Sequence, residues 1–113
     1  MKRHQSILDE IVAHKEQELK ERMASCPLTM LQAKVESGLP PRDLLTALRR
    51  GPGEPVRVLA EIKSASPSRG TIQGKIDPAA IARAYELSGA AALSVLTDWN
   101  YFSGTDAHLI QAR

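Results

Sequence analysis

Apolar residues in the first half of the chain recur with the period of a helix. Between residues 6 and 25, six of them fall near one helical face: Ile7, Leu8, Ile11, Val12, Leu19 and Met23. Ser6 and Asp9, three residues apart, resemble a capping box ahead of this run. The pattern predicts an amphipathic helix that begins after Ser6 and ends near residues 25–27.

Two shorter helices are expected next. A weaker pattern over residues 28–38 ends at Gly38, a residue suited to a left-handed C-terminal cap. A third helix opens with Pro40 and Pro41 in its first turn; its inward residues are Leu44, Leu45 and Leu48, and its last turn carries Arg49 and Arg50. Four breakers, two glycines and two prolines, in residues 51–55 end this half. We therefore expect residues 1–55 to form a helical extension.

The second half alternates strands and helices. A strand is predicted over about residues 57–63, followed by a long loop that ends at Asp77 and Pro78, an N-cap and a first-turn proline. The helix after them has Ile81, Ala84, Tyr85 and Leu87 inward and is capped by Gly89. Residues 91–97, AALSVLT, have the apolar character of a parallel strand buried on both faces. Strand, helix and strand form a βαβ unit. A polar loop over residues 98–104 and the start of another helix complete this part, residues 56–113.

Composition adds exclusions to this picture. The 113 residues suffice for one domain, and the formal charge of +2 is dispersed along the chain, without a nucleic-acid footprint. No apolar run approaches the roughly 20 residues that span a bilayer, and the first ten residues lack the apolar core of a signal peptide. Cys26, the single cysteine, has no disulfide partner and is expected to be an inert thiol. We expect a cytoplasmic protein.

Glu61 and Lys63 are the candidate chemical groups. Alternation along a strand puts both on the same side, opposite Ala60 and Ile62. Paired charges on a mostly buried strand are tolerated either as a structural ion pair or as part of a site, and the spacing leaves both open. The loop that follows, with Ser66 and Pro67, favours the site, because hydroxyl-rich loops at strand ends carry many functional residues.

Other chemically capable residues have plainer interpretations. His14 is expected to be a solvated helix residue far from any cluster of metal-ligand geometry, and His108 a surface or helix-packing residue. Trp99 is expected to be a partly buried loop aromatic. Phe102, from the residues alone, is best interpreted as a loop anchor.

Taken together, the motifs are similar to those of the indole-3-glycerol phosphate synthase family. The matching segments are VLAEIKSASPSRG (58–70), Asp77–Pro78 and YELSGAAALSVLTDWNYFSG (85–104), supported by PPRDLLTAL (40–48). The order Glu-x-Lys-x-x-Ser-Pro-Ser is kept without a gap. The resemblance covers essentially the whole chain, while the chain is well under half of the family's length.

The resemblance implies a (β/α)₈ barrel preceded by extra helices, of which this chain holds the first two βα units. It implies a carboxy-lyase (decarboxylase) of tryptophan biosynthesis. Its substrate would be the phosphorylated small molecule 1-(2-carboxyphenylamino)-1-deoxyribulose 5-phosphate, converted to indole-3-glycerol phosphate with loss of carbon dioxide and water. No metal and no organic cofactor are expected.

The resemblance also assigns roles to residues. Lys63 resembles the lysine that contacts the substrate carboxylate and donates a proton in the dehydration, and Glu61 the carboxylate that orients lysines and takes up a proton. Ser66 and Pro67 resemble the mobile first loop that closes over the substrate. Phe102 resembles the apolar wall for the anthranilate ring.

Two functional elements of the family lie beyond these residues: the general-acid lysine on the third strand, and the phosphate-binding loops after the last strands. The chain, which stops in the second turn of a helix after two parallel strands, is expected to be incomplete. Alternatives are another phosphate-binding barrel, and a non-catalytic fragment that associates with the missing barrel portion or another partner.

Overall fold

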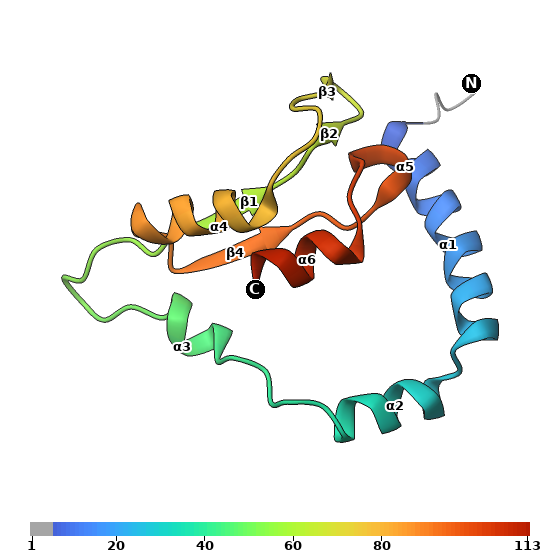
Figure 1. Ribbon diagram of the computed structural model, residues 1–113, viewed down its shortest axis with the longest axis horizontal. Coiled ribbons are helices and arrows are strands. Elements are labelled where there is room, and N and C mark those ends of the chain that lie inside the picture. Colours follow the sequence, from blue (N-terminus) through green and yellow to red (C-terminus); the bar gives the residue numbers. More distant parts are fainter. Residues whose placement is uncertain (1–5) are drawn as a thin grey trace. The chain divides into compact units, whose positions relative to one another are not determined.

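The computed structural model describes residues 6–113 (Figure 1). The chain divides into two compact units, one that runs through Arg42 and one from Asp43 to Arg113. We describe each unit by itself. None of the helices in the described residues combines the length and the apolar character needed to cross a membrane.

The first unit contains helices α1 (Ile7–Ser25) and α2 (Leu28–Glu36). The predicted capping box is confirmed: the Asp9 amide donates to Ser6 Oγ at 3.2 Å, and the Ser6 amide donates to Asp9 Oδ2 at 2.9 Å. The pKa of the Asp9 carboxyl is lowered mainly by the hydrogen bond from the Ser6 backbone N–H. The hydrogen bond with the Ser6 hydroxyl lowers it further. The first helix ends as predicted, at Ser25, two residues before Pro27.

Two predicted helix boundaries are wrong, one in the first unit and one at the start of the second. Gly38 is not among the glycines with positive φ, and the C-cap of α2 is Ser37 in the right-handed region. The third helix, α3 (Leu44–Leu48), begins only after Pro40 and Pro41, because Asp43 caps it by accepting from the Thr46 amide at 2.9 Å. A helix this short buries little on its own, and Leu44 and Leu45 are exposed where we expected them inward.

The second unit is built on the strands β1 (Leu59–Ile62) and β4 (Ala92–Val95), which pair in parallel (Figure 1). Between them lie β2 (Ala65–Ser66), β3 (Gly70–Thr71) and α4 (Pro78–Leu87). The helices α5 (Trp99–Phe102) and α6 (Asp106–Ala112) follow. Helix α4 packs against β1 and α6, and α6 packs against β4. The predicted βαβ unit is thereby confirmed as a mixed α/β structure with parallel strands.

Local signals define α4 at both ends. Asp77 accepts from the Ala80 amide at 3.0 Å, and Pro78 is the first helical residue. At the other end Gly89 has φ +93°, its amide donates to Glu86 O, and the Ala90 amide donates to Tyr85 O, both at 3.0 Å. These two bonds form a Schellman motif, which requires the left-handed glycine that the sequence predicted.

Burial is shallower than the sequence predicted. Strand β4 is half-buried throughout and not enclosed on both faces. In α4 the buried residues are Pro78 and Ala82, while Ala84 is exposed and Leu87 is 83% exposed. The described core of the unit centres on Ile62, Ala65 and Ala82. The reason is geometric, because a two-stranded sheet has no neighbouring strands to cover its edges and its second face.

Candidate active site

Glu61 and Lys63 meet at the carboxyl end of β1. Lys63 Nζ lies 3.3 Å from Glu61 Oε1, so the shared side that alternation predicted brings the two charges together. The side chains are 42% and 41% exposed, which corrects the premise that they are desolvated on a buried strand. An ion pair this exposed contributes only about 0–1 kcal/mol to stability. The ion pair therefore stabilises the fold only weakly, and both charged groups are accessible to a ligand.

Two further groups hold Glu61 from other elements. Ser94 on β4 is the register partner of Glu61, and its hydroxyl donates to Glu61 Oε2 at 3.1 Å. The Tyr85 hydroxyl, from α4, donates to the backbone carbonyl of Glu61 at 3.2 Å. Ser94 is not among the site residues predicted from the sequence. The available signal was its place as the polar residue inside the apolar run AALSVLT.

The loop after β1 is more ordered than expected. Its strands β2 and β3 form an antiparallel hairpin in which Ser66 pairs with Gly70. The carbonyl of buried Ser64 accepts from the amides of Ile72 at 2.8 Å and Gln73 at 3.1 Å. Gly70, with φ +62°, is the first residue of β3 and follows directly on the turn of residues 67–69. The candidate residue Ser66 is half-buried in β2, and Pro67 is exposed in the turn beside it.

The loop after β4, predicted as a polar loop over residues 98–104, contains the short helix α5. Asp98 caps it by accepting from the Tyr101 amide at 2.8 Å, and Phe102 is its last residue, half-buried. Helix α5 contacts β2, so the loops that carry Phe102 and Ser66 are neighbours. Trp99, the first residue of α5, is 69% exposed, contrary to the expected partial burial.

Gly104 fixes the end of this second loop. Its amide donates to Asp98 O at 2.8 Å, and it is buried against the backbone of Leu96 and Thr97. A Cβ at this position would collide with Leu96 O and approach the Thr97 Cα to 2.9 Å. Only glycine leaves room for this approach. His108, predicted to be a surface or helix-packing residue, is half-buried in α6.

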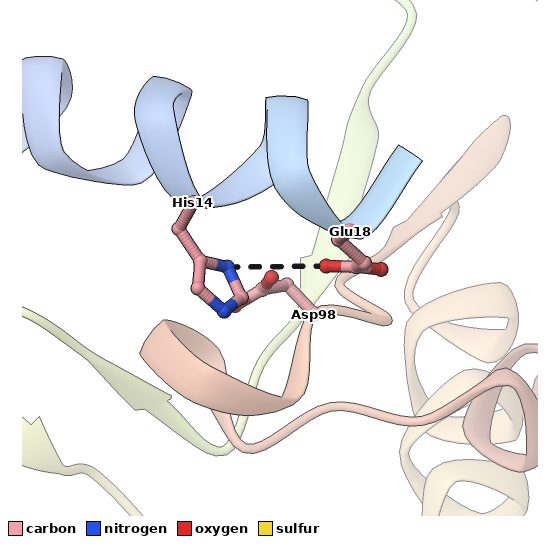
Figure 2. Close-up of side chains that lie close together, drawn as sticks. All are labelled: His14, Glu18 and Asp98. Atoms are coloured by element: carbon pink, nitrogen blue, oxygen red, sulfur yellow. Dashed lines mark ion pairs between the residues drawn. The ribbon is translucent and has the colours of Figure 1, made fainter. Parts of the chain in front are cut away.

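In the first unit, the carboxylate of Glu18 forms ion pairs with basic side chains of α1. Lys15 Nζ lies 2.6 Å from Glu18 Oε2 and Arg22 Nη2 lies 2.8 Å from Oε1. His14 Nδ1 lies 3.9 Å from Oε2, one turn earlier on the same helix (Figure 2). His14 is half-buried and has the Glu18 carboxylate as a neighbour, so the prediction of a solvated residue far from acidic groups is wrong. These i, i+3 and i, i+4 contacts support the helix.

Comparison with known proteins gives these elements a family. The sequence model of indole-3-glycerol phosphate synthase matches residues 8–113. The chain belongs to the indole-3-glycerol phosphate synthase family. Its relatives include the synthases of Acidithiobacillus ferrooxidans, 50% identical over 109 residues, and Microcystis aeruginosa, 47% identical over 109 residues. The matches cover 95% and 96% of this chain but 41% and 36% of the two relatives.

A third relative extends the same pattern. The synthase of Roseiflexus sp. is 40% identical over 104 residues, which are 92% of this chain and 38% of the relative. The chain therefore spans about two fifths of the length of its curated relatives. The family implies a (β/α)₈ barrel, whose sites lie at the carboxyl ends of the strands, and the described residues, 6–113, do not close that barrel. The Glu61–Lys63 pair occupies such a strand end.

Proposed function

We propose that these residues are the N-terminal part of an indole-3-glycerol phosphate synthase. The reaction converts 1-(2-carboxyphenylamino)-1-deoxyribulose 5-phosphate to indole-3-glycerol phosphate with loss of carbon dioxide and water. The observation that carries the proposal is the Glu61–Lys63 pair, 3.3 Å apart and half-exposed at a strand's carboxyl end. It stands in a chain that the family matches from residue 8 to 113.

Lys63 and Glu61 divide the polar work in this proposal. The ammonium of Lys63 is attracted to the substrate carboxylate and donates a proton when the hydroxyl leaves as water. The carboxylate of Glu61 keeps the ammonium oriented and takes up a proton. The half-exposed position supports this assignment, because the ammonium can exchange its ion pair with Glu61 for one with a ligand at small cost.

The two loops supply the surroundings. Ser66 and Pro67 would cover the bound substrate from the first loop, and Phe102 would form the apolar wall beside the anthranilate ring. The contact between α5 and β2 supports a common site, since it joins the two loops that carry these residues. Closing such loops over a substrate excludes water from the reacting groups.

The 113 residues alone are proposed to be inactive. The family's general-acid lysine belongs to a third strand and its phosphate-binding loops to the last strands, so ring closure and phosphate binding both need the rest of a barrel. The pairing of β1 and β4 as a two-stranded sheet agrees with this, because each strand has a second edge at which a further barrel strand could pair. The remaining barrel portion is therefore the partner that activity requires.

The test uses a completed chain, in which residues 1–113 are joined to the later part of the Acidithiobacillus ferrooxidans synthase. The fluorescence of indole-3-glycerol phosphate measures turnover. Lys63→Met keeps most of the stem's packing and removes the charge, and it should lower kcat by at least about a hundredfold. Lys20→Met, on the exposed side of α1, is the matched control and should leave kcat unchanged.

Two results would contradict the proposal. If Lys63→Met lowers the yield of folded protein while turnover per folded molecule survives, the ion pair is structural. If the unsubstituted completed chain folds and ignores this substrate but transforms another phosphorylated sugar, the chain belongs to a different barrel activity.

A further inference from the structure

The hydroxyl of Ser94 is placed to control the Glu61–Lys63 pair. Ser94 and Glu61 are register partners on the parallel strands β4 and β1. The carboxylate of Glu61 is divided between two donors, with Ser94 Oγ on Oε2 at 3.1 Å and Lys63 Nζ near Oε1 at 3.3 Å. A serine hydroxyl has one proton to donate, and here Glu61 receives it.

The half-buried, apolar environment of Ser94 is unfavourable for a polar side chain that makes no hydrogen bond. It is half-buried in the strand Ala92–Val95, between Leu93 and Val95. Such a strand position is more often occupied by an apolar β-branched residue. Burying a hydroxyl there costs free energy unless the hydroxyl is hydrogen-bonded. Its bond to Glu61 offsets that cost. The bond also crosses from one strand to the other, so the strand pairing itself sets where the carboxylate points.

We propose that Ser94 is a positioning residue for the synthase reaction, and this rests on the function proposed above. By holding Oε2, Ser94 fixes the rotamer of Glu61 and turns Oε1 toward Lys63. A half-exposed glutamate has several rotamers within reach in solution, and most of them do not present Oε1 to the ammonium. Ser94 itself touches no reacting atom.

The test compares Ser94→Thr with Ser94→Val in the completed chain. Threonine and valine are both β-branched and of similar shape, so the pair differs chiefly in the hydroxyl. We expect kcat to fall about tenfold in Ser94→Val relative to Ser94→Thr, the effect of one hydrogen bond to a charged group, with KM changed by less than about twofold. Equal kcat values in the two variants would overturn the proposal.

A double-mutant cycle separates positioning from a general structural effect. In a Glu61→Ala background the difference between Ser94→Thr and Ser94→Val should vanish, because the group on which Ser94 acts is gone. A difference that persists in that background means that Ser94 acts by another route, and the proposal is then wrong. Equal melting temperatures of the Thr and Val variants are the expected control.

A crystal structure of Ser94→Val in the completed chain gives a readout independent of turnover. We expect Glu61 to adopt another rotamer and the distance from Oε1 to Lys63 Nζ to lengthen beyond ion-pair range, while Ser94→Thr keeps the contact near 3.3 Å. An unchanged pair in Ser94→Val would refute positioning. If Lys63→Met retains turnover, the proposed roles fail, and the crystal structures still decide whether Ser94 positions Glu61.

Discussion

Replacing Gly104 by alanine tests how tightly the second loop is built. The added Cβ would meet three backbone atoms: Leu96 O, in direct collision, Leu96 C at 2.7 Å and Thr97 Cα at 2.9 Å. Backbone atoms at the end of a strand cannot rotate away as a side chain does, so the loop itself must shift. Overpacking of a buried site costs about 1–3 kcal/mol, and this contact should lie toward the upper end.

Gly74→Ala is the matched control. Nothing lies within 4 Å of a Cβ at Gly74, and its φ is outside the left-handed region. Alanine there removes freedom from the unfolded chain only, which stabilises by about 0.4–1 kcal/mol. The two substitutions add the same atoms, so their difference in unfolding free energy, about 2–4 kcal/mol, reports the available space.

The assay is urea unfolding of the completed chain, followed by dichroism, together with the Michaelis constant. Gly104→Ala should lower the midpoint and also raise KM, because Phe102 lies two residues before the displaced position. If Gly104→Ala and Gly74→Ala unfold at the same midpoint, the close approach of Gly104 to Leu96 is absent in solution.

Three further predictions concern the site, the first helix and the isolated chain. Phe102→Ala in the completed chain should raise KM several-fold, because it removes an aromatic contact of about 0.5–1.5 kcal/mol plus burial; unchanged affinity for a substrate analogue would contradict the assigned wall. The pKa of Asp9 is lowered from 3.8, so its contribution to the stability of α1 is complete above that pH and is lost as the pH falls through the lower folded value. Helical dichroism should follow this loss in the unsubstituted chain and show no such step in Asp9→Asn. The 113-residue chain without the rest of a barrel should show helical dichroism, bind a hydrophobic dye, exchange its amides quickly and form no indole-3-glycerol phosphate; a cooperative thermal transition or measurable turnover would contradict this.

Elements with local signals could be predicted from the sequence. The capping box of Ser6 and Asp9 and the ends of α4 at Asp77 and Gly89 depend on a few consecutive residues, and they formed as expected. The parallel pairing of the strands followed from their order with a helix between them. The shared side of Glu61 and Lys63 followed from strand alternation alone.

Features that depend on distant residues could not be predicted in this way. Ser94 and Glu61 are 33 positions apart in the sequence, and their hydrogen bond exists because of the register between β1 and β4. No local sequence pattern contains that register. The hairpin of β2 and β3 has two residues in each strand, too few to show alternation. The exposure of Leu87 reflects what packs next to α4 in space, which its apolar character does not reveal.

The hairpin in the first loop has a consequence for the energetics of ligand capture. Ordering a free loop costs about 1–2 kcal/mol of backbone entropy per residue, and that cost is subtracted from any affinity the loop provides. Here Ala65 and Ser66 are already paired with Thr71 and Gly70, and the Ser64 carbonyl ties down the two amides that follow. Much of the ordering has therefore taken place during folding, before any ligand arrives. A molecule that contacts Ser66 therefore has fewer residues to restrict, and it keeps a larger share of its contact energy as affinity.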